Sequence, residues 1–477
     1  MASLIPKKVN GMHDIFESDI RRTRLAINSM ETEFGKFGYH PVETPILEQT
    51  DLFLRKTGGD LAAQMYSFAE QGGNRIALRP ECTSPIIRLF LEQTMGRPLP
   101  VRLHYTGPVF RQGPSNDATP RQFTQVGAEL IGEESPNADG EILALALGSI
   151  QTVVPDRLTL TLGNVGVLQR ILGQFDISER AIHFFLNSVG SLSQGDDAKD
   201  IVRQEGQRVG IFSDANEEAN LAQISSYLST IGKETVRIGN DASPSGSLPG
   251  GRSPKEIIER LQRKIQNRDE NIKLEPALSF LSEIAQIHGT PTNALNEAMR
   301  IVSASKLDDE PLRDIKQIID RLAVYEIGNV DINVNFGLAR GIAYYTGLIF
   351  EIRQTDDPKW TILGAGGRYD GLVKALGGAV DVPALGFACS MEAILGSRNE
   401  PQRESDLTNS DPLIVIAPAA PDAMDAAVNE AQQLRKTGQS VEIMFRDIRR
   451  EETPEPNSRT IIRVDSDGNK ESYDISD

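Results

Sequence analysis

The chain has few of the residues that build disulfide frameworks, metal sites or membrane spans. Its 477 residues include two distant cysteines, Cys82 and Cys389, and five scattered histidines. This spacing predicts neither a disulfide framework nor a zinc site, and it fits a reducing compartment. No run approaches the roughly 18 apolar residues of a membrane-spanning helix, and "MASLIPKKVNGMHDIF" lacks the apolar core of a signal peptide. We therefore expect a soluble cytoplasmic protein without a metal site.

Positive charge is also scarce. Fifty Lys and Arg residues stand against 67 Asp and Glu residues, which gives a net charge of −17. Such a surface repels a phosphate backbone as a whole, so nucleic-acid binding would require a local basic face. The longest basic stretch, "RDIRR" at residues 446–450, is typical of a solvated turn. Composition therefore gives no support for a nucleic-acid-binding surface.

The hydrophobic pattern predicts an α+β fold with two or three domains. Ile27, Met30, Phe34 and Phe37 follow helical spacing, which predicts an amphipathic helix over residues 19–37. Short β-rich runs between "YHPVETPILEQ" and "TLTLGNVG" then alternate with helical segments such as residues 140–152. This alternation favours a mostly antiparallel sheet with helices on one side.

The organisation changes twice further along the chain. Helix formers dominate residues 167–325, where "GNDASPSGSLPGGRSP" at 239–254 has the composition of a flexible loop. Strand alternation resumes at "DINVNFG", and a last α/β segment follows a polar linker, with strands "PLIVIA", "VEIMF" and "TIIRV" and a helix over 422–436. We predict four segments: a core, first part (1–185), a helical insertion (186–325), a core, second part (326–396), and a small α/β domain (411–477).

Four polar stretches lie within the β-rich surroundings. They are "LRPECTSP" (78–85), "GPVFRQGPSNDATPRQFTQVGAELIG" (107–132), "GLARGIAYYTGLIFEI" (337–352) and "GAGGRYDGL" followed by "VPALGFACSMEAIL" (364–395). Buried polar groups need partners, so a convergent set must satisfy itself or receive a ligand. The candidate residues are Glu81, Thr83, Arg111, Gln125, Glu129, Arg340, Tyr344 and Tyr345. "GAGGRYDG" lacks the pattern of a phosphate-binding loop, and a β-turn is its simpler interpretation.

Together these stretches resemble the class II aminoacyl-tRNA synthetase core, specifically the histidyl-tRNA synthetase branch. "GLARGIAYYTG" is similar to the histidine-binding signature of that family, and "FRQGPSNDATPRQFTQ" resembles its motif 2. The likeness runs in order over about residues 8–185 and 326–395, with partial likeness from residue 411. It implies an antiparallel sheet flanked by helices, with a helical insertion and a truncated anticodon-binding-like domain.

The resemblance also implies roles for the candidate residues in binding free histidine. Glu81, Thr83 and Gln125 would hold the ammonium group, and Arg340 with Arg111 would face the carboxylate. Glu129 and Tyr345 would contact the imidazole, while Tyr344 is as consistent with packing as with ligand contact. These residue types suit the chemistry, because an ammonium needs acceptors, a carboxylate suits a guanidinium fork and an imidazole needs both a donor and an acceptor. Glu81 and Arg340 could instead form a structural ion pair.

The chain departs from the synthetase pattern where ATP would bind. Family members carry an arginine in motif 3 directly after the position of Glu392, and this chain has Ala393 there. The acidic residue expected two places after Arg111 is Gly113, and the aspartate of the signature is Ala343. Adenylation requires fixed cations around the phosphates, so these losses predict an inactive adenylation centre beside an intact histidine pocket.

Within the family, these departures resemble the regulatory subunits of ATP phosphoribosyltransferase. The resemblance implies a catalytically silent protein of histidine biosynthesis that binds histidine as effector and forms a hetero-oligomer with a short-form ATP phosphoribosyltransferase catalytic subunit. It also implies self-association through the class II-like core, no cofactor of its own and no binding to membranes, and the truncated C-terminal segment disfavours transfer RNA.

Two alternatives remain open. One is an active histidine–tRNA ligase, using ATP and Mg²⁺, in which another arginine such as Arg368 replaces the missing cation. The other is a paralogue that senses or transfers a different amino acid, or an interaction protein with a vestigial pocket.

Overall fold

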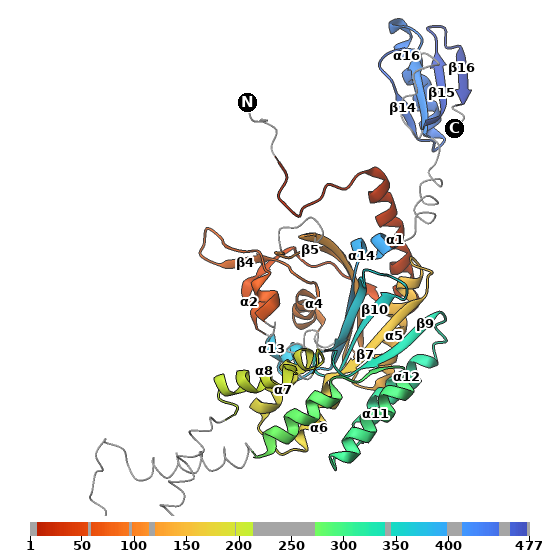
Figure 1. Ribbon diagram of the computed structural model, residues 1–477. Helices are drawn as coiled ribbons and strands as arrows, with labels where there is room; N and C mark the ends of the chain where they lie inside the picture. The colour runs from red at the N-terminus through yellow and green to blue at the C-terminus, as the bar shows by residue number, and fades with distance from the viewer. Residues whose placement is uncertain are drawn as a thin grey trace, which may run out of the picture. The chain divides into compact units, whose positions relative to one another are not determined.

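The computed structural model describes most of the chain and divides it into two compact units, Met1–Ser397 and Arg398–Asp477 (Figure 1). The described residues are 7–55, 59–94, 98–113, 120–195, 197–212, 272–338, 345–397, 413–447 and 458–474. Within these ranges no helix is long and apolar enough to cross a membrane. The same ranges contain no group of three or more His, Cys, Asp or Glu side chains placed to hold a metal ion.

A nine-stranded mixed sheet forms the centre of the larger unit. Neighbouring strands of this sheet are antiparallel, except for the pairs β1–β5 and β7–β9, which are parallel. In spatial order the strands are β1 (His40–Pro41), β5 (Val101–Phe110), β6 (Gln122–Ile131), β12 (Ala384–Ser390), β11 (Ile362–Arg368), β10 (Leu348–Gln354), β7 (Leu158–Asn164), β9 (Val330–Asn335) and β8 (His288–Gly289). The predicted α+β class is confirmed.

Helices α1 (Glu17–Lys36), α5 (Pro136–Gln151) and α14 (Met391–Ser397) pack on one face of this sheet. The predicted helix over 19–37 corresponds to α1. Helix α5 begins before the predicted residue 140, because the extended Ser135 precedes a proline in the first turn, where proline's missing N–H costs nothing. It is buried almost all round, so it acts as the central core helix of the unit.

The opposite face of the sheet is covered as well, so the expectation of helices on one side was wrong. Helix α4 (Thr83–Leu89) packs there against Leu103 and Tyr105 of β5, while His104 between them lies against Phe34 of α1. On β5 the residues that face α4 are buried, whereas those on the α1 side are half-buried except for His104, so the strand keeps a visible alternation. Smaller elements in this part are β2 (Leu47–Gln49), α2 (Thr50–Leu54), α3 (Gly59–Ala63), β3 (Ser67–Ala69), β4 (Arg75–Leu78), the π-helical turn Phe90–Thr94 and α13 (Leu372–Ala375).

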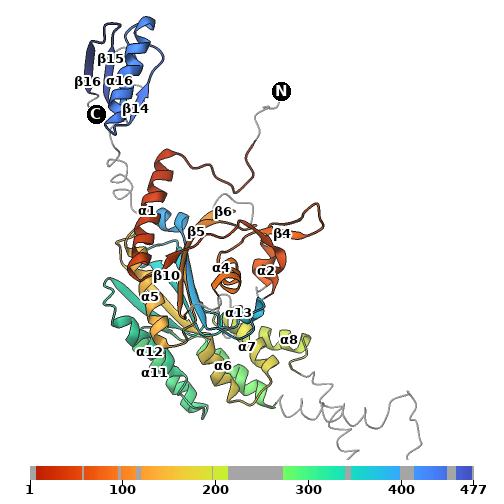
Figure 2. The same ribbon diagram turned by 180° about the vertical axis from the view of Figure 1, so that it is seen from behind.

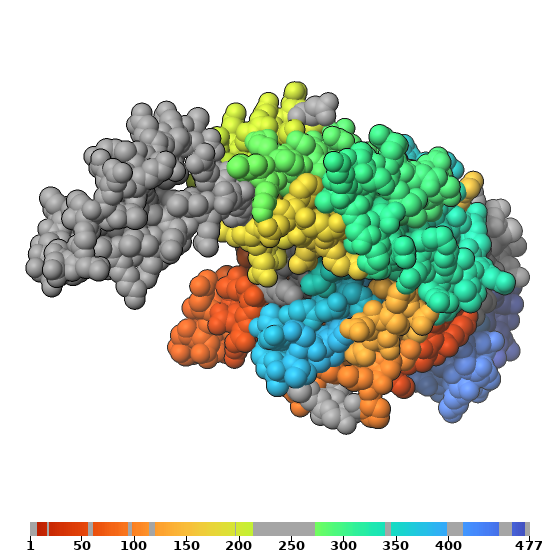
Figure 3. All heavy atoms as spheres, turned by 90° about the horizontal axis from the view of Figure 1, so that it is seen from below, coloured from red at the N-terminus to blue at the C-terminus, as the bar shows by residue number. Residues whose placement is uncertain are grey.

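Helices dominate the described residues between Val165 and Ala323, a stretch that begins before the predicted insertion (186–325) and includes its described part. They share a second hydrophobic core with β9 and β10, and they gather on one part of the larger unit's surface (Figures 2 and 3). They are α6 (Val165–Gly173), α7 (Glu179–Leu192), α8 (Asp197–Arg208), a helix over 272–284, α11 (Pro291–Ala304) and α12 (Leu312–Ala323). The loop predicted at 239–254 lies outside the described residues.

The C-terminal unit is a small α/β structure with its own core. Strands β14 (Val441–Ile443), β13 (Leu413–Pro418) and β15 (Ser458–Val464) are parallel neighbours, and β16 (Lys470–Asp474) adds antiparallel to β15. Helix α16 (Met424–Lys436) packs on this sheet. Its end matches the prediction, since Gly438 adopts the positive φ of 87° that favours glycine.

Candidate functional site

The structure brings four of the eight predicted residues together on the α4 side of the central sheet. Glu81 and Thr83 lie at the start of α4, and Gln125 and Glu129 lie on β6. On β6 the intervening Val126, Ala128 and Leu130 belong to the core beneath α1 and α5, so strand alternation directs Gln125 and Glu129 to the opposite face. Of the remaining residues, Arg111 follows β5 and Tyr345 precedes β10, while Arg340 and Tyr344 lie outside the described residues.

Glu129 is the most buried member of the group. Its side chain accepts a hydrogen bond from the Thr83 hydroxyl at 2.7 Å on one oxygen and from the Tyr369 hydroxyl on the other. Burial raises the pKa of Glu129 to about 8, against the lowering effect of the hydroxyl groups of Tyr369, Thr83 and Tyr105. The carboxyl group therefore holds a proton at neutral pH in the free protein, and an ionised carboxylate there would retain unused lone pairs for a ring N–H.

Glu81 and Gln125 are held by backbone amides at the start of α4. Both Glu81 oxygens accept from the amide of Ser84 at 3.1 Å, and the Gln125 side-chain oxygen accepts from the amide of Cys82 at 3.2 Å. Burial raises the pKa of Glu81, while the Ser84 hydrogen bonds and the charge of Arg111 oppose this rise. Hydrogen bonds within the protein therefore fix the acidic groups. Some polar groups of the candidate site already have hydrogen-bond partners in the chain itself.

Arg111 and Tyr345 are each held by contacts of their own. The Arg111 Nε donates to the carbonyl of Pro80 at 2.8 Å, and its guanidinium lies 5.2 Å from the centre of the Phe123 ring. Tyr345 is half-buried between two hydrophobic clusters. Arg111 is therefore oriented by stacking and by one carbonyl, with its charge close enough to lower the pKa of Glu81.

Glycines form the part of the sheet over which these side chains lie. A Cβ atom on Gly386 would sit 1.6 Å from a Glu129 carboxyl oxygen, and one on Gly367 would sit 2.8 Å from the Tyr345 ring. A Cβ on Gly127 would sit 2.6 Å from the Tyr105 hydroxyl. These positions require glycine because of close approach.

We expect Gly386→Ala to be strongly destabilising. The new methyl group would collide with Glu129 and lie 2.6 Å from the backbone oxygen of Ala128, so the strand itself must move. Overpacking of this kind costs about 1 to 3 kcal/mol. The matched control is Gly35→Ala near the end of α1, where a Cβ would meet nothing within 4 Å. Urea unfolding should show a lower free energy of unfolding for the first variant alone; equal values would contradict this packing.

Sequence reasoning missed two tyrosines of the site. Tyr369 follows β11 and donates to Glu129, and Tyr105 of β5 lies among the same groups on the α4 face. The expectation of a β-turn at "GAGGRYDG" was wrong for residues 364–368, which form the last five residues of β11. The glycines of "GAGGRYDG" could have indicated a strand that other side chains approach closely, and Tyr369 follows directly after that strand.

Arg368 does not occupy the place of the missing phosphate clamp. Its guanidinium is buried in ion pairs with Asp139 of α5 at 3.0 Å and with Asp370 at 3.3 Å. Asp139 belongs to the helix on the face opposite Glu129, and burial raises its pKa to about 6 despite the nearby Arg368. The ligase alternative therefore loses the arginine suggested as its replacement cation.

The motif 3 position lies close to the site strands. Glu392 accepts from the amide of Thr124 on β6 at 2.9 and 3.0 Å, which ties α14 to β6. Ala393, the next residue, is half-buried beside the core, and its amide donates to the Ser390 hydroxyl at 3.3 Å. The backbone here is well defined, but the side chain carries no charge.

Three comparisons place the chain among known proteins. It is 28% identical over 469 residues to the histidine–tRNA ligase of Methanocaldococcus jannaschii, covering 98% of this chain and 92% of that protein. The fold is similar to the crystal structure of an ATP phosphoribosyltransferase regulatory subunit/histidyl-tRNA synthetase from Bacillus halodurans, with a TM-score of 0.62 at 20% identity over 93% of each chain. Histidyl-tRNA synthetase from Nostoc sp. PCC 7120 gives a TM-score of 0.62 at 15% identity, covering 99% of this chain and 97% of that one.

The predicted class II synthetase-like architecture is confirmed by these folds. A family model for histidyl-tRNA synthetase matches residues 11–207 and 252–394, which include the α4 start, both β5–β6 strands, β11 and the motif 3 position. The chain therefore belongs to the histidyl-tRNA synthetase family.

Proposed function

We propose that this protein is a regulatory, catalytically silent member of its family that binds free histidine and activates and feedback-regulates a short-form ATP phosphoribosyltransferase. The observation that carries the proposal is the contrast between a convergent group of polar side chains and an uncharged motif 3 position. Glu81, Thr83, Gln125 and Glu129 stand together with Arg111 beside them, whereas Ala393 removes the motif 3 cation.

The electrostatics of the described site support this division. Negative charge that develops on phosphate oxygens during the reaction is stabilised by preorganised cations. Losing one such stabilising group lowers the reaction rate by about 10² to 10³. Gly113 removes a second expected contact, and Arg368 is committed to Asp139 and Asp370. Recognition of an amino acid requires none of these groups, so binding can persist where adenylation is lost.

Regulation through such a site requires two states of an assembly that differ in their affinity for histidine. Coupling free energies of about 1 to 3 kcal/mol are typical of effectors, which corresponds to roughly 5- to 150-fold changes in affinity. The fold resembles that of the Bacillus halodurans protein, which is named as a regulatory subunit/histidyl-tRNA synthetase, and this supports an assembly with a catalytic partner. In this proposal the partner supplies the enzymatic activity.

The proposal is tested by reconstitution with the short-form ATP phosphoribosyltransferase of the same genome. We expect the catalytic chain to be activated by this protein and then inhibited by histidine, with histidine binding to the regulatory chain measured by calorimetry. Glu129→Gln should retain activation and weaken inhibition by histidine. A lack of both binding and activation would contradict the proposal.

An active histidine–tRNA ligase is the second candidate. It is favoured by the curated relatives, because the chain covers most of the length of proteins named histidine–tRNA ligase. Histidine-dependent exchange between ATP and pyrophosphate separates the two candidates, since only the ligase catalyses it.

A further inference from the structure

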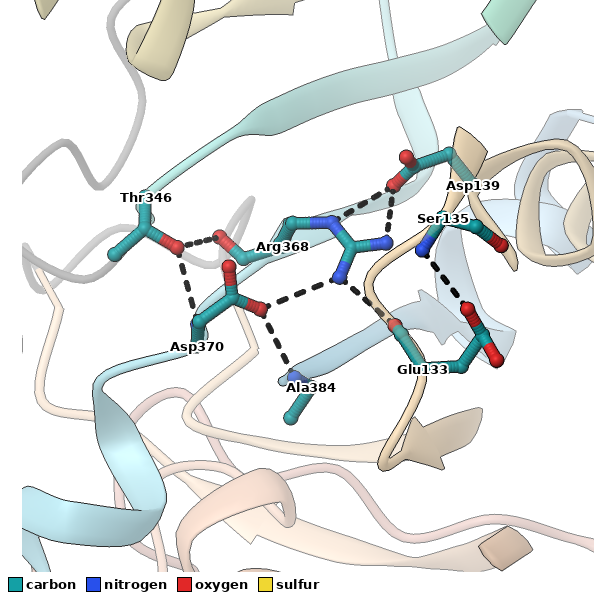
Figure 4. Close-up of polar contacts among 7 residues, drawn as sticks. All are labelled: Glu133, Ser135, Asp139, Thr346, Arg368, Asp370 and Ala384. Atoms are coloured by element: carbon teal, nitrogen blue, oxygen red, sulfur yellow. Dashed lines mark hydrogen bonds and ion pairs between the residues drawn. The ribbon is translucent and has the colours of Figure 1, made fainter. Parts of the chain in front are cut away.

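A buried arginine network lies at the end of β11, directly before Tyr369, on the opposite face of the sheet from Glu129. Arg368 forms ion pairs with Asp139 at 3.0 Å and Asp370 at 3.3 Å, and it donates to the carbonyl of Glu133 at 3.0 Å (Figure 4). The side chains of Arg368 and Asp139 are only 8% and 7% exposed. A buried pair of this kind is costly to break, because either partner alone would leave an uncompensated charge.

The network reaches the histidine-signature stretch through hydrogen bonds to Thr346. The Thr346 amide donates to the carbonyl oxygen of Arg368 at 2.7 Å. Its hydroxyl donates to the same oxygen at 3.4 Å and accepts from the amide of Asp370 at 3.0 Å (Figure 4). Asp370 therefore contacts Arg368 with its side chain and Thr346 with its backbone.

The residues on either side of Thr346 are seated on the same strand. Tyr345 lies so close to Gly367 that a Cβ there would sit 2.8 Å from the Tyr345 ring. A Cβ on Gly347 would sit 3.0 Å from the side chain of Arg368, and the Gly347 carbonyl accepts from the amide of Val165 at 2.9 Å. Three consecutive residues of the signature are thus fixed on β11 and α6.

We propose that Arg368, Asp139 and Asp370 form a positioning network that holds Thr346, and thereby Tyr345, in the geometry needed to bind histidine. The inference rests on the proposed histidine site, but it concerns residues that touch no ligand. Supporting groups of this kind fix the orientation of the residues in contact, and small displacements there reduce affinity. Arg368 is thus a positioning residue instead of a phosphate-binding one.

The test replaces the Thr346 hydroxyl while leaving the charged residues intact. Thr346→Val keeps the size of the side chain and removes its hydrogen bonds, so we expect histidine to bind about three- to tenfold more weakly by calorimetry. Thr346→Ser keeps the hydroxyl and loses the methyl group, so it should bind like the wild type. Thr159→Val, which removes a hydroxyl contact to Thr355 at 2.9 Å elsewhere, is the control.

A packing role would give the reverse order, with the serine variant weaker than the valine variant, and would overturn the inference. Hydrogen–deuterium exchange of the peptide containing residues 345–348 provides a readout without histidine. It should be faster in Thr346→Val than in the wild type and the control, and equal exchange would overturn the inference. If the wild-type protein binds no histidine, the proposed function is overturned. The hydrogen–deuterium exchange rates alone would then show whether the network holds Thr346 in place.

Discussion

Glu129→Gln is expected to reduce the loss of stability that the wild type shows between pH 6.5 and 8, while weakening histidine binding about 10- to 100-fold. The folded carboxyl keeps its proton up to a pKa of about 8, whereas the ordinary pKa of an exposed glutamate is 4.5. Between these values the folded state binds more protons than the unfolded state, so stability falls as pH rises. For this shift the fall between pH 6.5 and 8 amounts to about 1 to 2 kcal/mol.

The glutamine variant is suited to this test because it preserves the contacts of the free site. Its amide oxygen can accept from Thr83, and its amide nitrogen can donate to the hydroxyl oxygen of Tyr369. Asp139 also has a raised pKa, but its value of about 6 confines its effect to lower pH. Histidine would lose an acceptor oxygen in the variant, which explains the weaker binding.

Urea unfolding at pH 6.5 and 8, with calorimetry of histidine binding, measures both effects. His104 has a pKa lowered by burial, which gives a contribution of opposite sign, but this is common to both proteins and cancels in the comparison. Glu134→Gln, on an exposed residue nearby, should change neither quantity. A pH dependence that is the same in Glu129→Gln and in the wild type would contradict the raised pKa.

Local sequence patterns predicted the helices at 19–37 and 140–152 and the β-rich character of the motif stretches in the larger unit. The helix at 19–37 had clear periodicity, and the strands of the four motif stretches had turn signals around them. The second helical layer on the sheet was missed because Arg102 and His104 of β5 are polar and would ordinarily indicate an exposed face, whereas they lie against α5 and α1. Strand β16 was missed because Lys470–Asp474 is polar and gains its structure from pairing with β15.

The candidate site was predictable where side-chain chemistry matched a family motif. Glu81, Thr83, Gln125 and Glu129 came together as expected, because they lie on the start of α4 and on one face of β6. Partners that depend on strand order were not predictable, since Tyr369 reaches Glu129 across β12. The ion pair between Arg368 and Asp139 was likewise not predictable, because it joins residues 229 positions apart in the sequence.

Ala393→Arg is expected to raise the rate of histidine-dependent ATP–pyrophosphate exchange about 10²-fold from the wild-type level. The wild type should be slower than an active histidine–tRNA ligase by about 10⁴ or more, because two contacts of about 10² to 10³ each are missing. Position 393 lies beside Glu392, which is bonded to Thr124 of β6, so an arginine there starts from a backbone fixed to the site strand.

The control is Ala393→Met, which adds a chain of similar reach without a charge and should leave the exchange rate unchanged. Addition of Gly113→Glu to the arginine variant should raise the rate further, because it returns the second missing group near Arg111. Circular dichroism and thermal melting confirm that each variant is folded before its rate is compared. Exchange at the ordinary rate of a ligase by the wild type would contradict the silent-site proposal, because Arg111 and the uncharged Ala393 would then suffice to stabilise the transferring phosphates.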